Sequence, residues 1–268
     1  MVSHMNFENV VVNQESIESD LTIYQEAQLS WVRNFNPLSP AGSARWPTSA
    51  GIYEPLFIYN SIAAEYVPWL ATHYKWNRNN TVLTMSIGNG VNWSDGEPFT
   101  AIDVAYTINL KKKHRALDTR DSWGYLKEVI STTDTTVQFT FQRVYVPGFD
   151  AIANQSIIPK HIWENVDDPV KFSNPNPVGT GPFTEIIRFG NQLWELGKNS
   201  NYWQTGKPFI DKLIFPAYPS NEQVTLALLS GELDWAGAFI PAIERIFISK
   251  DPEHHRYWFP LTGHTTFL

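Results

Sequence analysis

The chain has 268 residues, which is enough for one large domain or two ordinary ones. Its 20 Lys and Arg residues against 27 Asp and Glu residues give a net charge of −7, which argues against nucleic acid or an anionic membrane as the main partner. The absence of cysteine excludes disulfides, cysteine-based zinc sites and thiol nucleophiles, and no apolar run approaches the roughly 20 residues of a membrane span.

The first five residues, Met-Val-Ser-His-Met, lack the charged and apolar regions of a signal peptide. We interpret residues 1–5 as a cloning remnant and expect that a native signal peptide has been removed. A short strand is predicted at 21–25, followed by a long loop at 26–51 that is rich in Pro and Gly. Loops of this length in compact domains tend to be functional. Residues 52–70 are predicted to form a helix or an irregular turn packed on a sheet.

Two segments alternate apolar and polar residues with the period of a half-buried strand, at 81–87 and at 135–141. They predict antiparallel strands with one solvated face. Between them, Ser94 to Pro98 supplies turn chemistry, and Thr100 with Asp103 forms a weak capping box that begins a helix at 101–113. The basic run at 111–115 is interpreted as a solvated helix end.

The second half of the chain predicts a β-hairpin, with strands at 183–189 and 192–196 around a Gly190-Asn191 turn. A strand at 210–218, a helix at 222–230 that ends at Gly231, a short strand at 233–235 and a helix at 241–248 follow. Strands and helices alternate without a strict βαβ rhythm, so the predicted fold class is α/β with mixed sheets.

Signatures of catalysis are missing from this sequence. It has no Gly-x-Ser-x-Gly elbow, His-Glu-x-x-His helix, phosphate loop or dinucleotide fingerprint. Adjacent histidines at 254–255 lie in what reads as an exposed turn, where their side chains would point apart. We therefore expect a protein that is not an enzyme and has neither a cofactor nor a metal site.

One stretch, VNWSDGEPFTAIDVAYTI at 91–108, resembles the signature of the family 5 extracytoplasmic solute-binding proteins, the oligopeptide, dipeptide and oligosaccharide receptors of ABC importers. NFNPL at 34–38, YEPLF at 53–57, NPVGTGPF at 176–183 and SGELDWAG at 230–237 resemble further landmarks of that family, in the expected order.

The resemblance implies a periplasmic-binding-protein-like type II fold, in which two α/β lobes close on a ligand held between them. Family members are longer, so the resemblance implies that residues 6–268 form the N-terminal lobe alone, truncated before the second lobe. Residues 60–175 are expected to be an inserted subdomain. The implied location is extracytoplasmic, in the periplasm or anchored at the cell surface, and the implied partner is an ABC permease.

Aromatic residues make up 14% of the chain and include 11 Trp. Indole faces stack on the C–H faces of sugar rings, and amides and charged groups bind hydroxyls. Together with its likeness to cellobiose and β-glucan receptors, this favours an oligosaccharide ligand, bound weakly by a single lobe. By their place in similar segments, the expected ligand-binding residues are Trp31, Arg33, Asn34, Trp46, Trp123, Asn154, Gln155, Trp235, Gly237 and Phe239.

Several alternatives stay open. Each Trp can instead pack in the core, and Asn34 and Asn36 can cap the loop through bonds to the backbone. Within the same family, the ligand can be an oligopeptide or dipeptide. In a different class of function, the chain is a protein-interaction or scaffold fragment whose exposed cleft face self-associates.

Overall fold

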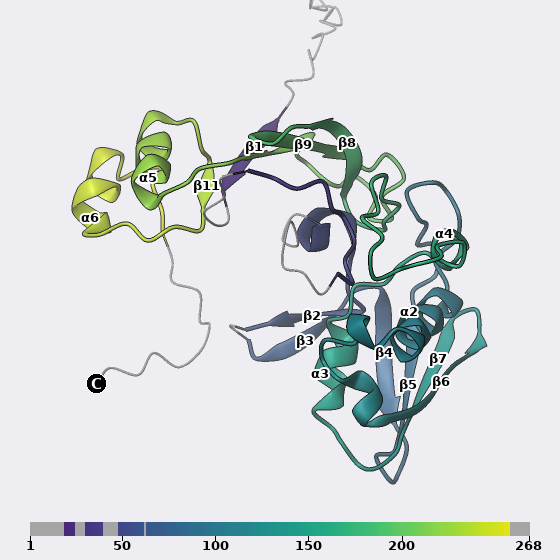
Figure 1. The fold of residues 1–268 in the computed structure, drawn as a ribbon. Coiled ribbons are helices and arrows are strands. Elements are labelled where there is room, and N and C mark those ends of the chain that lie inside the picture. Colours follow the sequence, from purple (N-terminus) through teal and green to yellow (C-terminus); the bar gives the residue numbers. More distant parts are fainter. Residues whose placement is uncertain (1–18, 25–29, 40–47, 62, 258–268) are drawn as a thin grey trace, which may run out of the picture.

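A computed structural model describes residues 19–24, 30–39, 48–61 and 63–257 of the chain. In this part the strands form three sheets, and the helices are short apart from α2 and α5 (Figure 1). The arrangement confirms the predicted α/β class with mixed sheets.

A five-stranded sheet contains the strands nearest to the two ends of the described chain. Its order is β11 (Trp235–Ala236), β1 (Asp20–Tyr24), β10 (Lys212–Pro216), β9 (Leu193–Lys198) and β8 (Phe183–Phe189). Strand β1 runs parallel to both neighbours, whereas β10, β9 and β8 are antiparallel. The predicted hairpin of β8 and β9 is confirmed, and its turn is closed by the Gly190 N–H, which donates to the Leu193 carbonyl at 2.8 Å.

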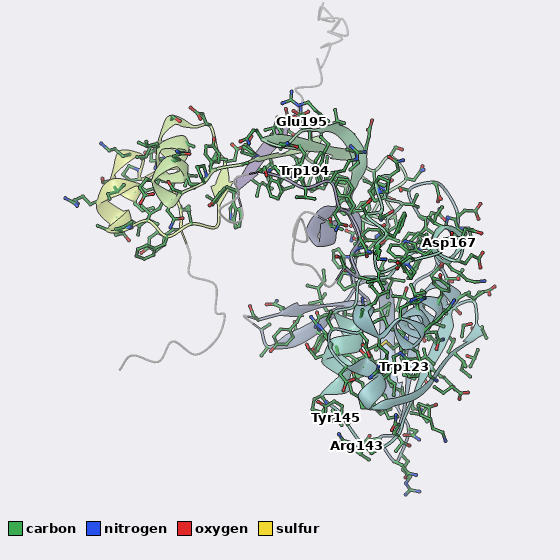
Figure 2. All side chains as sticks on the ribbon, in the orientation of Figure 1. Trp123, Arg143, Tyr145, Asp167, Trp194 and Glu195 are labelled. Carbon is green, nitrogen blue, oxygen red and sulfur yellow. The ribbon has the colours of Figure 1, made fainter. Side chains whose placement is uncertain are left out.

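Side chains on β9 alternate in the way a half-covered sheet requires. Trp194 and Leu196 are buried, whereas Leu193 and Glu195 are partly exposed (Figure 2). The buried Trp194 ring stacks on Phe215 of β10 with ring centroids 4.7 Å apart. This sheet is therefore anchored by aromatic packing on one face.

A second, four-stranded sheet is antiparallel throughout. Its order is β4 (Ala71–Trp76), β5 (Val82–Ile87), β7 (Thr136–Phe141) and β6 (Leu126–Thr133). The two alternating segments predicted as antiparallel strands are β5 and β7, and they pair with each other. Helix α2 (Ala101–Lys113) covers β6 and β7.

The capping box predicted before α2 is confirmed. Thr100 Oγ1 accepts from the Ile102 N–H at 3.2 Å, and Asp103 Oδ2 accepts from the Thr100 N–H at 2.9 Å. Trp93 in the turn before it is completely buried. The basic end of α2 is solvated as predicted at Lys112, Lys113 and Arg115, but Lys111 is buried. Its ammonium lies 3.4 Å from Asp118 and donates to Gln155 Oε1 at 2.8 Å.

Residues 57–68 correct the expectation of a helix or irregular turn between 52 and 70. They form a two-stranded hairpin of β2 (Phe57–Asn60) and β3 (Glu65–Pro68), preceded by a π-helical turn at Thr48–Ile52. Aromatic and β-branched residues at 57–59 and 66–67 favour strand over helix. Strands β4 and β6 were also absent from the sequence prediction.

The remaining helices are α3 (Gly148–Ala153), α4 (Lys160–Trp163), α5 (Asn221–Ser230) and α6 (Ile243–Ile246), and the 3₁₀ turns are Arg115–Leu117, Ser122–Gly124 and Ile248–Lys250. Helix α5 ends at Gly231, whose φ of 76° is left-handed, as predicted. The helix predicted at 241–248 is shorter than expected, because α6 covers four residues of it.

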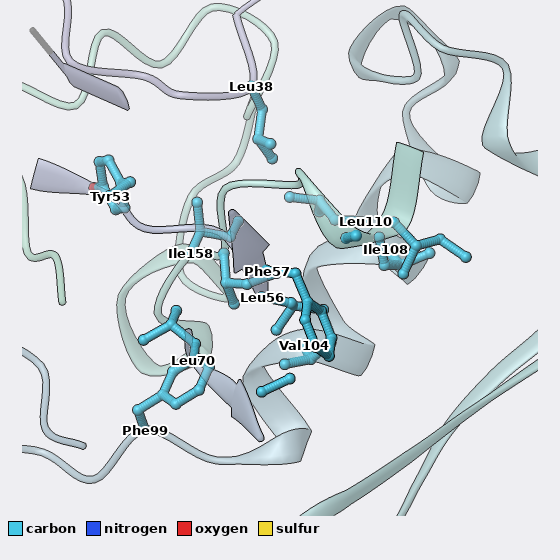
Figure 3. Close-up of a cluster of buried hydrophobic side chains, with 14 of the residues drawn as sticks. Leu38, Tyr53, Leu56, Phe57, Leu70, Phe99, Val104, Ile108, Leu110 and Ile158 are labelled. Atoms are coloured by element: carbon cyan, nitrogen blue, oxygen red, sulfur yellow. The ribbon is translucent and has the colours of Figure 1, made fainter. Parts of the chain in front are cut away.

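Buried apolar residues from both large sheets belong to one core, part of which lies between α2, the start of β2 and the segment around Ile158 (Figure 3). Two glycines close this core without side chains. A Cβ added to Gly179 would lie 2.0 Å from the carbonyl oxygen of Ile52, and a Cβ added to Gly181 would lie 2.2 Å from the carbonyl oxygen of Gly51. The 51–52 and 179–181 segments therefore pack backbone against backbone.

Candidate functional site

Trp31 lies in the core. It is 6% exposed, its ring packs edge-on against Trp194 and Phe215 at 5.8 and 6.5 Å, and its backbone N–H donates to the Asn191 carbonyl at 2.7 Å. This is the core-packing alternative, with no face of the indole presented to a ligand. Trp46, the other tryptophan of the long loop, lies outside the described residues.

Arg33 and Asn34 hold the loop after Trp31 in place. Arg33 Nη2 donates to the Pro175 carbonyl at 3.0 Å, and its guanidinium lies 5.5 Å from the centroid of the Phe189 ring. Asn34 Oδ1 accepts from the Asn36 N–H at 3.0 Å. Asn36 in turn accepts from the Leu38 N–H at 2.8 Å, so both amides make the capping bonds of the alternative interpretation.

Trp123, Asn154 and Gln155 lie on the four-stranded-sheet side of the molecule, and Figure 2 places Trp123 far from Trp194. Trp123 is buried, and its indole N–H donates to the Ile108 carbonyl at 2.9 Å. The Gln155 amide bridges Lys111 and the Ser156 carbonyl. The Asn154 amide donates to Asp150. These three residues are therefore engaged in local structure.

Trp235, Gly237 and Phe239 come together at the end of β11. Asp234 Oδ2 accepts from the Thr22 N–H at 2.7 Å, and the Gly237 N–H donates to the Tyr24 carbonyl at 2.8 Å. These bonds fix β11 along β1, at the outer position of the five-stranded sheet. Trp235 is partly buried against the core, whereas the Phe239 side chain is 68% exposed.

A pocket of about 390 Å³ lies beside Phe239, between α5 and the chain that leads into α6. Its apolar wall consists of Leu226, Phe239, Ile240, Pro241 and Ile246, and its polar wall of Asn221, Glu222 and Thr225. The sequence prediction included Phe239 but missed the α5 residues. No sequence signal pointed to them, because the 67% exposure of the apolar Leu226 side chain on α5 is known only from the structure.

A buried carboxylate is a further feature that the sequence prediction missed. Glu54 is 6% exposed, and its oxygens accept from Trp69 Nε1 at 2.8 Å, the Tyr202 hydroxyl at 2.9 Å and Trp203 Nε1 at 2.9 Å. Burial raises the pKa of Glu54, and the bonds from Trp203, Trp69 and Tyr202 partly offset this increase. We interpret this group as structural, because its oxygens are taken up by side chains of the protein itself.

Neither a metal cluster nor a membrane helix is found in the described part of the chain. No group of three or more His, Asp or Glu side chains is placed to hold a metal ion there, and no described helix has both the length and the apolar character to cross a bilayer.

The comparisons with known proteins agree on one family. The model of the bacterial extracellular solute-binding proteins, family 5 (Middle), matches residues 65–268. A Brucella ovis protein described as an ABC transporter peptide-binding protein is 27% identical over 207 residues, which is 75% of this chain and 38% of that protein. The Escherichia coli nickel-binding periplasmic protein is 26% identical over 246 residues, covering 86% of this chain and 45% of that one.

Among solved structures, a Thermotoga maritima periplasmic oligopeptide-binding protein of an ABC transporter, crystallised with mannohexaose, matches with a TM-score of 0.79 and 29% identity. The match covers 88% of this chain and 44% of that one. The chain thus spans less than half the length of these relatives, and the match confirms a periplasmic-binding-protein-like fold.

Proposed function

Because the chain belongs to family 5 of the bacterial extracellular solute-binding proteins, we propose that it captures an oligopeptide for an ABC importer. In this proposal it forms one side of the ligand cleft, and residues 235–239 supply its share of the peptide site. Capture of a ligand outside the cytoplasm for such an importer is the role of the family; the peptide and the residues are our proposal. The ABC permease is the proposed partner of the longer protein.

The observation that carries the proposal is the end of β11. Beyond Gly237 the chain leaves the sheet, and the backbones of Ala238 and Phe239 make no hydrogen bond to another backbone group in the described residues. An extended peptide can pair with such main-chain groups, and the pocket beside Phe239 can take one of its side chains. Relatives named for peptide binding support the same ligand class.

Oligosaccharide is the second candidate, and the mannohexaose in the Thermotoga maritima structure favours it. The burial of Trp31 and Trp123 weakens the argument from indole stacking, because two of the expected sugar-stacking rings pack in the interior. For this reason we place the peptide first.

The test measures binding of a ligand to the 268-residue chain by saturation-transfer NMR, which detects weak complexes. We expect an octapeptide to bind with a Kd of roughly 1 mM, because contacts from one side of a cleft must offset the ligand's lost freedom. The same octapeptide with N-methylated amides should not bind, since it cannot donate from its backbone.

A matched pair of variants locates the site. Phe239→Ala should weaken the octapeptide several-fold, whereas Phe209→Ala, which removes another highly exposed ring, should leave its affinity unchanged. The proposal fails if the octapeptide does not bind, if the N-methylated peptide binds equally well, or if cellohexaose binds at Phe239 in place of the peptide.

A further inference from the structure

A surface of aromatic rings lies on the β2–β3 hairpin and its neighbours, separate from residues 235–239. The rings of Tyr59, Tyr66, Phe149 and Tyr74 form a continuous run, with successive centroids 5.0, 4.8 and 4.2 Å apart. Tyr59 is 46% exposed and Tyr74 is 43% exposed, whereas Phe149 is buried between them. We call these four rings the tyrosine platform.

The fold holds this platform rigid. Tyr59 and Tyr66 face each other across the antiparallel β2–β3 pair, and Phe149 comes from α3. The buried ring of Phe57 packs edge-on against Tyr74 at 5.6 Å and lies 5.8 Å from Phe149. Two exposed rings are therefore fixed by packing, and little conformational freedom is left for a ligand to remove.

An open polar group borders the platform. Asp150 Oδ1 accepts from the Tyr66 hydroxyl and from Asn154 Nδ2, the latter at 2.8 Å. Its Oδ2 lies 3.8 Å from Arg120 Nη1, which is too long for a hydrogen bond. The side chains of Asp150 and Arg120 are 59% and 51% exposed. The carboxylate is thus oriented by two protein donors, while its second oxygen and the guanidinium face solvent.

We propose that the tyrosine platform binds the sugar ring of a neutral oligosaccharide. Exposed phenol rings offer flat apolar faces to the C–H face of a pyranose, and a neighbouring carboxylate and guanidinium can accept from and donate to its hydroxyls. Because Asp150 and Arg120 carry opposite charges, the site has no net charge that would select an ionic ligand. Asn154 acts here as a positioning residue for Asp150.

This site uses none of the residues assigned to the peptide, so it stands or falls independently of the proposed function. In the experiment, the 268-residue chain is titrated with cellohexaose, mannohexaose and xylohexaose in turn, and binding is measured by saturation-transfer NMR. We expect at least one of the three to bind. The double substitution Tyr59→Ala with Tyr74→Ala should weaken that sugar at least tenfold, since it removes both exposed stacking faces.

Further variants separate the platform from other sites and from misfolding. Arg120→Gln should weaken the sugar without disturbing the hairpin, because this side chain is half exposed. Phe209→Ala should bind as the unmodified chain does. Circular dichroism checks that each variant is folded, and Tyr59→Ala alone replaces the double variant if the latter is not.

Three outcomes overturn the proposal. None of the three hexaoses binds; or the folded tyrosine variant binds as tightly as the unmodified chain; or Trp235→Ala abolishes sugar binding while the tyrosine variant retains it, which would place the sugar at the end of β11.

Discussion

Glu54 provides a sharp test of how this fold is held together, because one buried carboxylate serves three donors from two distant segments. Trp69 precedes β4, whereas Tyr202 and Trp203 lie more than 130 positions beyond it in the sequence. Replacing Glu54 with Leu leaves three half-buried donors without an acceptor. Each such donor costs about 1–3 kcal/mol, so we expect the free energy of unfolding to fall by about 3–9 kcal/mol.

Glu54→Gln should cost less. The amide oxygen can still accept from Trp69 and Tyr202, but its NH₂ group would oppose the Trp203 indole N–H. One lost bond predicts a decrease of about 1–3 kcal/mol in the free energy of unfolding. Urea denaturation followed by tryptophan fluorescence measures both values, and Glu128→Gln, at an exposed position of β6, is the control.

The pH dependence has a defined sign. Burial raises the pKa of Glu54 above its value in the unfolded chain, so its stabilising contribution is complete below the unfolded pKa and is lost as pH rises through the folded pKa. The difference in the free energy of unfolding between the unmodified chain and Glu54→Gln should therefore shrink as the pH rises above about 4.3, the pKa of an unperturbed Glu. A cost below about 1 kcal/mol for Glu54→Leu would refute the reasoning.

Four more predictions concern stability and are measured by denaturation. Gly181→Ala should lower the free energy of unfolding by about 3 kcal/mol, because the new Cβ would lie 2.2 Å from the Gly51 oxygen. Gly190→Ala is the control and should cost less than about 1 kcal/mol, because the nearest atom to its new Cβ lies 3.4 Å away. Equal costs for the two variants would contradict the close packing at Gly181. Lys111→Met should lower the free energy of unfolding by about 3 kcal/mol, because it removes the buried ammonium 3.4 Å from Asp118 and leaves the mostly exposed Arg115 guanidinium at 3.9 Å. Exposed Lys113→Met should be near neutral. Burial alone would raise the pKa of Asp118, but the N–H groups of Trp123 and Ser122 and the charge of Lys111 lower it overall. The contribution of Asp118 to stability is therefore present above about pH 4 and is lost in acid. An acid unfolding transition that Asp118→Asn leaves unchanged would contradict this. Thr100→Ala should cost about 1 kcal/mol through loss of the α2 cap, and a cost near zero would show that Asp103 caps the helix alone.

Elements with local signals were predictable from the sequence. Helix α2 has its cap at Thr100, and the β8–β9 hairpin has its turn at 190–192, so both were located to within one or two residues. Strand β6 was missed because register shifts near Leu126 and Ser131 break its alternation. Strand β4 was missed because most of its side chains are exposed and show no apolar stripe.

Contacts between distant segments were beyond sequence reasoning. Lys111 reads as a solvated helix end until Asp118 and Gln155 are placed beside it. Composition indicated an excess of tryptophan, but it could not say that Trp31 packs on Trp194 while Trp235 lies at the edge of the sheet. Of the proposed site, the sequence therefore suggested residues 235–239, and its α5 wall emerged from the structure.

The contact of Gly179 and Gly181 with Gly51 and Ile52 has a consequence for how sequences of this shape can diverge. A junction between side chains can drift by paired changes, in which one residue shrinks as its neighbour grows. Where main chain contacts main chain, there is no opposing side chain that could become smaller, so a larger residue at either glycine cannot be compensated by a second substitution. We therefore expect sequence variation to be concentrated outside this contact, with the 51–52 and 179–181 segments kept in place.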